Sequence, residues 1–183
     1  MPLLAVVFSA AALAQPNPNW DVGVAASYVR GGGFDGPGVA VQSLWSPNEY
    51  LALGPMVDVA YVSTGLKAGN RLPASYAFTS TLAAGMVELT LPLRFVEPYA
   101  GFGLGYVDVS GKRSVNTQCG LGSGFGGLLA VGGRAAMSEH LTLGIRGSAR
   151  SSSMQQTCET AFGPASFDVP VLFALSSTLD YRW

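Results

Sequence analysis

The stretch LSSTLDYRW, residues 175–183, alternates two kinds of side chain up to its last residue. The odd positions carry Leu175, Ser177, Leu179, Tyr181 and Trp183, and the even positions carry Ser176, Thr178, Asp180 and Arg182. A period of two predicts a β-strand with one apolar and one polar face. Terminal residues of soluble domains are usually polar and frayed. An ordered strand that ends in tryptophan therefore indicates that its apolar face contacts an apolar medium.

The composition of the whole chain also indicates contact with an apolar medium. Charged residues make up 11% of the 183 residues, against roughly 25% in soluble domains, and the mean hydropathy is +0.33. After the N-terminus, however, we find no run of the roughly 18 apolar residues that a membrane-spanning helix needs. The net charge of −1 lacks the basic footprint of a nucleic-acid-binding protein. We therefore exclude nucleic acid as a partner.

The first 14 residues, MPLLAVVFSAAALA, have the features of a secretory signal peptide. The apolar stretch from Leu3 to Leu13 ends in Ala12-Leu13-Ala14, which is the small-x-small pattern of a cleavage site. A buried first helix is the alternative, but prolines at positions 16 and 18 would break it at once. No lysine or arginine precedes the apolar stretch, which departs from the usual pattern. We expect residues 1–14 to be a signal peptide and residues 15–183 to be the mature domain.

The same alternation recurs along the mature chain. It predicts eight strands, over residues 20–30, 39–45, 51–63, 77–92, 99–107, 125–137, 141–150 and 167–183, of which the second and fourth alternate more weakly. Long connections rich in glycine and polar residues follow the first, third, fifth and seventh strands, beginning with RGGGFDGPG at 30–38. Short turns follow the second, fourth and sixth. Long loops on one side and tight turns on the other are typical of outer-membrane barrels.

Membrane physics explains the pattern. Inside a bilayer every backbone polar group must find a partner, so strands can cross only as a closed sheet. The outer face must then be apolar, and the inside of an eight-stranded barrel is filled by its own side chains. The sequence predicts an all-β fold, an eight-stranded antiparallel up-and-down transmembrane β-barrel. A soluble lipocalin-type barrel is the rival fold, and it requires an apolar inside and a polar outside.

Aromatic residues fall near the predicted strand ends, where amphipathic rings favour the lipid headgroup level. At the short-turn rim we expect Trp20, Trp45, Tyr181 and Trp183, and at the opposite rim Tyr28, Tyr61, Tyr106 and Phe125. Two prolines oppose the assignment, because Pro55 and Pro92 would each remove a ladder donor. We expect a bulge at Pro55.

These features together resemble the small OmpA/OmpX-type outer-membrane barrels. The resemblance covers residues 20–183 and rests on eight strands, alternating loop lengths and the final strand VLFALSSTLDYRW. The segment EPYAGFGLGY also looks like the fifth strand of such proteins. The resemblance implies the outer membrane of a Gram-negative bacterium, contacts with outer-membrane lipids, and recognition of the last strand by the barrel-insertion machinery. Phenylalanine is commoner than tryptophan at the last position in that family.

Charged residues on the predicted inner face form the first candidate site. They are Asp58, Glu88, Arg134, Arg146, Arg150, Asp180 and Arg182. A charge inside a narrow barrel is costly unless it is paired, so we expect an ion-pair network that plugs the interior. A gate or proton path is the alternative, since buried membrane charges are often functional.

The two cysteines, Cys119 and Cys158, lie in the third and fourth long loops. Exported proteins meet an oxidising periplasm, which favours a disulfide between these loops. Two free thiols are the alternative. No set of histidines and cysteines indicates a metal site, and we expect no cofactor.

The sequence offers little for catalysis. The single histidine, His140, falls in a short turn, whereas lipid A-modifying barrels use a histidine with a serine near the outer leaflet. We expect a monomeric, non-catalytic barrel with a structural or adhesin-like role. The outer loops mix Lys67, Arg71, Lys112 and Arg113 with Asp35 and Glu159, and this slight basic excess favours lipopolysaccharide or host glycans as ligands. A lipid A-modifying enzyme and a narrow pore for small solutes are the alternatives.

Overall fold

The computed structural model describes residues 19–64, 77–111, 117–119, 122–160 and 163–183. The predicted signal peptide, residues 1–14, lies outside the described residues. So do four basic loop residues, Lys67, Arg71, Lys112 and Arg113. Within the described part of the chain, no helix is long and apolar enough to cross a membrane.

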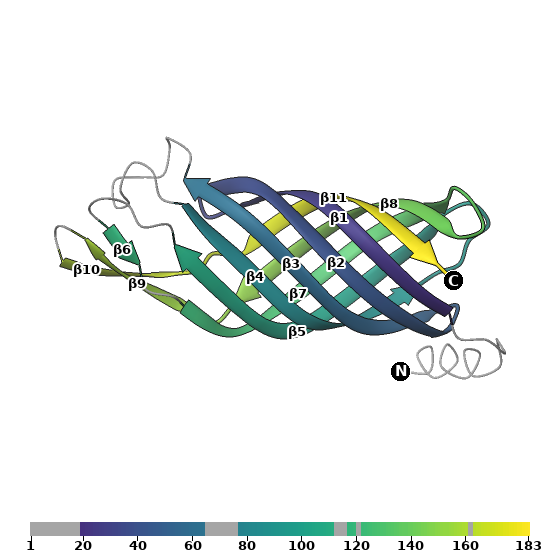
Figure 1. Ribbon diagram of the computed structural model, residues 1–183, viewed down its shortest axis with the longest axis horizontal. Coiled ribbons are helices and arrows are strands. Elements are labelled where there is room, and N and C mark those ends of the chain that lie inside the picture. The colour runs from purple at the N-terminus through teal and green to yellow at the C-terminus, as the bar shows by residue number, and fades with distance from the viewer. Residues whose placement is uncertain (1–18, 65–76, 112–116, 120–121, 161–162) are drawn as a thin grey trace, which may run out of the picture.

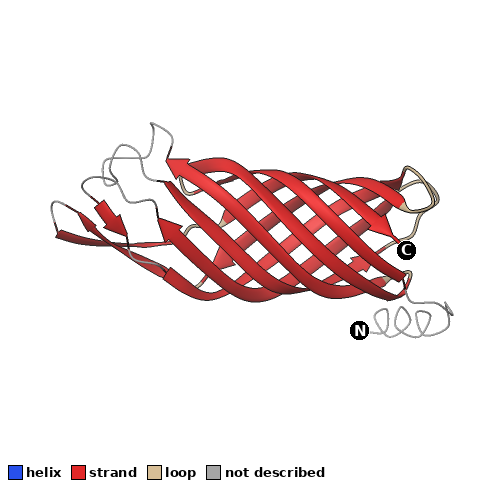
Figure 2. Ribbon diagram, in the orientation of Figure 1, coloured by secondary structure: helices blue, strands red, loops and turns tan. Residues whose placement is uncertain are grey.

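Eight strands close into a single antiparallel barrel (Figures 1 and 2). Their bounds are β1 Asn19–Gly31, β2 Phe34–Asn48, β3 Leu51–Thr64, β4 Ala77–Thr90, β5 Glu97–Gly111, β7 Gly122–Ala136, β8 Leu141–Ser152 and β11 Leu172–Arg182. Each strand pairs with the next barrel strand along the chain, and β11 pairs with β1 to close the ring. The predicted fold class and strand number are confirmed.

The two ends of the barrel differ in their connections. At the short-turn end, residues 49–50, 91–96 and 137–140 join neighbouring strands, and Trp183 exchanges backbone hydrogen bonds with Trp20. At the long-loop end, the segments after β3, β5 and β8 are long. The first connection was predicted to be a long loop and is instead a tight hairpin, because Gly32 and Gly33 have φ of 59° and 86°. Positive φ at both central residues is the geometry of a type I′ turn.

A second, three-stranded sheet extends from the long-loop end, on the left of Figure 1. It consists of β6 Thr117–Cys119, β9 Gln155–Thr160 and β10 Gly163–Asp168, in the order β10-β9-β6. The sequence predicted loops over most of these residues. The last predicted strand, 167–183, is accordingly divided: its first residues belong to β10, and Val169 is buried in the apolar interior.

Neither proline interrupts the barrel in the predicted way. Pro55 lies opposite Gly85 of β4 without a bulge. On the β2 side, the pairs before and after Pro55 are Gln42 with Met56 and Trp45 with Leu53, and both have the same register. Because Pro55 has no backbone N–H, the β2–β3 ladder is weaker at this point, but the strand contains no extra residue. The register shift between β2 and β3 lies between Trp45 and Asn48 instead. Pro92 follows the end of β4 and belongs to a connection.

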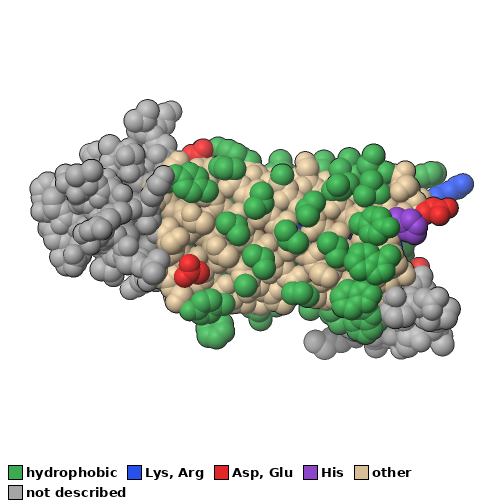
Figure 3. Space-filling view, viewed as in Figure 1, with side chains coloured by type: hydrophobic (Ala, Val, Ile, Leu, Met, Phe, Trp, Pro, Cys, Tyr) green, Lys and Arg blue, Asp and Glu red, His purple; other side chains and the backbone are tan. Residues whose placement is uncertain are grey.

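The outer wall of the barrel is apolar. Exposed large side chains such as Val41, Leu104, Leu129 and Ile145 alternate with inward-facing residues along the strands. Figure 3 shows hydrophobic side chains along the whole visible wall, whereas charged side chains gather toward its two ends. This distribution is the reverse of a soluble lipocalin-type barrel, and it is the wall that a bilayer requires.

The interior has two sections of different chemistry. Toward the short-turn end it holds a charged section, which comprises Asp21, Gln42, Asp58, Glu88, Glu97, Arg134, Arg146, Arg150, Asp180 and Arg182. Toward the long-loop end it holds an apolar section, which comprises Val29, Phe34, Val62, Phe78, Leu82, Val107, Val109, Leu128, Met154, Val169 and Leu172. The expectation of a polar interior therefore fits the charged section and is wrong for the apolar section.

Candidate functional site

Arg150 and Asp58 lie on opposite sides of the bore. Arg150 belongs to β8 and Asp58 to β3, which are four strands apart in the eight-stranded ring. Arg150 Nη1 donates to Asp58 Oδ1 at 3.1 Å, and both side chains are buried. Since the two strands are diametrically opposed, the pair forms a bar across the full width of the barrel. It lies at the boundary with the apolar section, because Leu82 pairs with Asp58 and Leu128 with Arg150.

A glutamine links the next two predicted charges. Arg146 Nη1 donates to Gln42 Oε1 at 2.9 Å, and Gln42 Nε2 donates to Asp180 Oδ1 at 3.3 Å. All three side chains are buried. The amide can serve both partners because it carries an acceptor oxygen and a donor nitrogen. Gln42 was not predicted from the sequence, because only charged residues were considered as candidates. The alternation of residues 39–45 nevertheless places Gln42 on the inner face.

A second group of ion pairs lies at the short-turn end. Arg134 Nη2 donates to Glu88 Oε1 and, at 3.1 Å, to Thr90 Oγ1. Arg182 Nε donates to Asp21 Oδ1 at 2.8 Å. Unlike the Arg150–Asp58 bar, Arg134 and Glu88 come from strands only two positions apart in the ring.

Glu97 joins these pairs into one group. Its Oε2 lies 3.4 Å from Arg182 Nη2 and 3.9 Å from Arg134 Nε. Glu97 was not among the predicted inner charges because it falls between the predicted strands 77–92 and 99–107. Asp21 was not among them either, although it lies on the inner face of the first strand. A polar pocket of about 180 Å³ opens beside this group, lined in part by Asn19 and Asn48. Its lining includes Asp21, Glu97, Arg134 and Arg182, so the pocket opens directly on these ion pairs, and the Arg150–Asp58 bar and the apolar section lie deeper in the bore.

The apolar section fills the other half of the bore. Val62 and Leu82 have no exposed surface and Phe78 retains 1%. The rings of Phe34 and Phe78 meet edge to face, with centroids 5.0 Å apart. In the charged section, a small residue on β5 leaves room for a large one on β4: a Cβ at Gly101, the register partner of Glu88, would lie 2.6 Å from the Met86 side chain. Small residues next to large ones are what the narrow interior of a small barrel requires.

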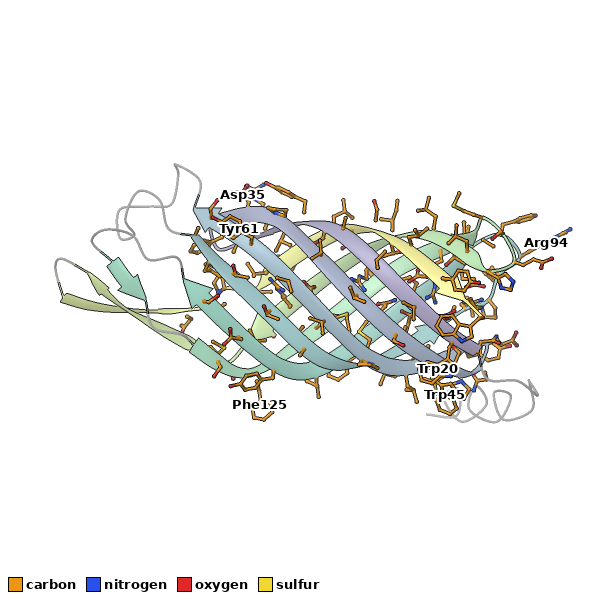
Figure 4. The ribbon with its side chains drawn as sticks, in the orientation of Figure 1. Trp20, Asp35, Trp45, Tyr61, Arg94 and Phe125 are labelled. Atoms are coloured by element: carbon orange, nitrogen blue, oxygen red, sulfur yellow. The ribbon has the colours of Figure 1, made fainter. Side chains whose placement is uncertain are left out.

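The predicted interface aromatics all face outward. Trp20 and Trp45 are register partners on β1 and β2 at the short-turn end, and Figure 4 shows them there. Tyr181 stacks near Trp183, with centroids 5.9 Å apart. At the other end are Tyr28, Tyr61, Tyr106 and Phe125, each at least 43% exposed. Two aromatic levels thus bound the apolar wall.

The short-turn histidine has a structural contact. His140 Nδ1 lies 3.0 Å from the backbone oxygen of Arg182, and its ring lies 5.8 Å from that of Tyr181. Among the described residues, no three His, Cys, Asp or Glu side chains are grouped so that they could hold a metal ion.

A closed ring of eight antiparallel strands, an apolar wall between two aromatic levels and internally paired charges define a class of protein. The chain has the fold of the small outer-membrane β-barrels of bacteria. In such barrels the short turns face the periplasm and the long loops face the outside.

Comparison with known proteins supports this class through structure alone. No protein-family model and no curated protein sequence matches the chain. Among solved structures, Neisserial surface protein A aligns with a TM-score of 0.61 at 11% identity, over 91% of this chain and 97% of that chain. OprG of Pseudomonas aeruginosa aligns with a TM-score of 0.60 at 8% identity, over 91% and 95%.

A third similar structure is Ail, the attachment invasion locus protein of Yersinia pestis. It aligns with a TM-score of 0.52 at 12% identity, over 91% of this chain and 97% of that chain. Ail has also been solved in complex with the heparin analogue sucrose octasulfate. At such low identities the likeness establishes the fold, and the resemblance to small outer-membrane barrels is confirmed at that level.

Proposed function

We propose that this protein is a non-conducting, non-catalytic outer-membrane barrel that acts through its outer loops as an adhesin-like binder of polyanionic glycans. The observation that carries the proposal is the filled bore. Side chains cross it at the Arg150–Asp58 bar, and beyond that bar Leu82 and Phe78 are fully buried. Since an eight-stranded barrel has room only for such side chains, the bore offers no path to a solute, and the outer loops remain as the place of action.

The charge pattern of the loops indicates the chemistry of the ligand. Residues 65–76 contain Lys67 and Arg71, residues 112–116 contain Lys112 and Arg113, and neither segment contains an acidic residue. The two segments follow β3 and β5, which flank β4 in the ring. Arginine and lysine side chains make charge-assisted hydrogen bonds with sulfate and phosphate groups. Four cations on neighbouring loops therefore favour sulfated or phosphorylated glycans.

The complex of Ail with a heparin analogue provides a precedent on the same fold. It shows that one eight-stranded barrel with a similar chain course accommodates a highly sulfated sugar. For the present chain this remains a proposal, because the identity is 12%. A lipid A-modifying activity has less support, since His140 lies in a connection at the short-turn end.

We also propose a disulfide that stiffens the outer sheet. The register of β6 and β9 sets Cys119 directly opposite Cys158. Directly opposed residues of an antiparallel pair have Cα atoms about 4.5–5.5 Å apart, which lies within the range that a disulfide requires. A bridge here would join the segment after β5 to the segment after β8.

Binding of sucrose octasulfate to the full chain in lipid nanodiscs tests the function. By isothermal titration calorimetry we expect salt-sensitive binding that K67Q/R71Q/K112Q/R113Q weakens by about tenfold or more, since each charge-assisted contact contributes on the order of 1 kcal/mol. R30Q is the matched control, because Arg30 lies at the same end of the barrel in the tight β1–β2 hairpin. Absence of binding at low salt, or equal loss in R30Q, would refute glycan binding. Stepwise conductance in planar bilayers would refute the closed bore.

A further inference from the structure

A furrow of about 760 Å³ lies on the outer wall of the barrel, over β5, β7 and β8. Its sides include Phe102, Leu104, Phe125 and Leu129, which are exposed. Between them the strands carry the small residues Gly127 and Ala149, which belong to the outward-facing set by alternation. The furrow therefore arises from a local change in side-chain size, because these small residues lie between the large side chains that form its sides.

The packing of the barrel does not require a glycine at the base of the furrow. A Cβ at Gly127 would lie 3.7 Å from its nearest neighbours, the Gly103 carbonyl oxygen and Leu104 Cδ2, which is an ordinary van der Waals distance. Inward-facing glycines differ, since a Cβ at Gly101 would lie 2.6 Å from Met86. The space above Gly127 is thus a feature of the outer surface and not a by-product of internal crowding.

The position of the furrow identifies its occupant. From Leu129 to Phe125 it follows four residues of β7, or about 13 Å of strand at about 3.3 Å per residue, which spans about 10 Å of membrane depth at a strand tilt of about 40°. Half of the hydrocarbon core measures about 15 Å. Phe125 belongs to the aromatic level at the long-loop end, so the furrow faces the hydrocarbon of the outer leaflet. It is continuous with the lipid-facing wall, and it contains no charged side chain that points outward.

Polar groups are confined to one end of the furrow. Ser151 faces outward beside Gly127, its register partner, and Ser153 Oγ donates to the Phe125 carbonyl oxygen at 3.3 Å. One hydroxyl beside Gly127 and one next to Phe125, with an apolar furrow on the side toward Leu129, match a lipid with its polar part upward. We propose that this furrow binds one acyl chain of an outer-leaflet lipid, with the ester or amide region of that lipid next to Ser151.

The proposal is independent of glycan binding by the loops, and lipid retention tests it. The full chain, extracted from membranes in a mild detergent, is examined by native mass spectrometry. We expect one co-purifying lipid per barrel, and we expect G127L/A149L, which fills the furrow, to lower the retained fraction by at least about fivefold through loss of van der Waals contact. G85L is the matched control, because Gly85 also faces outward from a barrel strand and a Cβ there would meet nothing within 4 Å.

Each outcome decides the proposal. Retention lost in G127L/A149L but kept in G85L supports it, provided that both variants show the heat-dependent gel migration of a folded barrel. Equal retention in all three proteins, or no retained lipid in the wild type, overturns it. A dimer that G127L/A149L disrupts would also overturn it, because the furrow would then be occupied by a second copy of the chain.

Discussion

Replacing Asp58 with leucine should destabilise the barrel more than replacing Asp58 and Arg150 together. Asp58 and Arg150 are 5% and 7% exposed, and their charged atoms are 3.1 Å apart. At that distance and an effective dielectric constant of about 20, the attraction between unit charges is about 5 kcal/mol. In D58L the arginine keeps its desolvation cost and loses this attraction. We expect the free energy of unfolding to fall by about 3–5 kcal/mol.

The double variant D58L/R150M should behave differently, because it removes both charges. The register neighbours of the pair, Leu82, Leu128 and Leu172, are apolar and fully buried. Two apolar replacements would extend the apolar section toward the short-turn end. A buried ion pair exchanged for packed apolar residues is often neutral or stabilising by about 1–4 kcal/mol. We therefore expect D58L/R150M to be at least as stable as the wild type.

Urea unfolding from lipid vesicles, followed by tryptophan fluorescence, measures both variants. Trp20, Trp45 and Trp183 report insertion, since all three face outward at one rim. Circular dichroism after refolding provides the control that each variant still forms a sheet. The reasoning fails if D58L and D58L/R150M lose the same free energy, because the cost would then come from lost packing and not from an unpaired charge.

Three further outcomes follow from the structure. I145R puts a charge on the middle of the lipid-facing wall and should lower the free energy of unfolding by about 2–4 kcal/mol, whereas F125R at the rim should lower it by about 0–1 kcal/mol. Equal losses for the two variants in unfolding from lipid vesicles would contradict the assigned membrane depth. G33V should cost about 1–3 kcal/mol in the same assay, because φ is 86° at this position, and an unchanged midpoint would refute the type I′ turn. Under denaturing conditions, Cys119 and Cys158 should react with a maleimide only after reduction, and labelling without reductant would exclude the bridge.

Much of the barrel could be predicted because the bilayer imposes a strong contrast between the two faces of a strand. The contrast is clear in β11, where Leu175 and Leu179 face outward and Thr178 and Asp180 face inward. It is weak in β4, where Phe78 and Leu82 face inward, and there the sequence alternates poorly. The apolar section was missed for this reason. Where both faces of a strand are apolar, periodicity gives no information about the interior.

Other features depended on geometry that a linear pattern does not contain. The residues that face inward were readable, but the partner of each charge depends on which strands oppose each other across the ring. Arg150 reaches Asp58 on the far side, whereas Asp180 receives its hydrogen bond from Gln42. The start of β2 was missed because Gly36 and Gly38 are typical of loops, yet a barrel wall accommodates them where neighbouring strands approach closely. At Gly38 a Cβ would lie 2.5 Å from Ser27 Oγ.

The pairing of β1 with β11 has a consequence for biogenesis. Asn19 begins one partner and Arg182 ends the other, so almost the whole barrel must be synthesised before the ring can close. Until then β1 and β8 each present an unpaired edge, and such edges readily recruit other chains. Because closure waits for the last strand, we expect this chain to aggregate during folding more readily than proteins whose strands pair locally and leave no edge open.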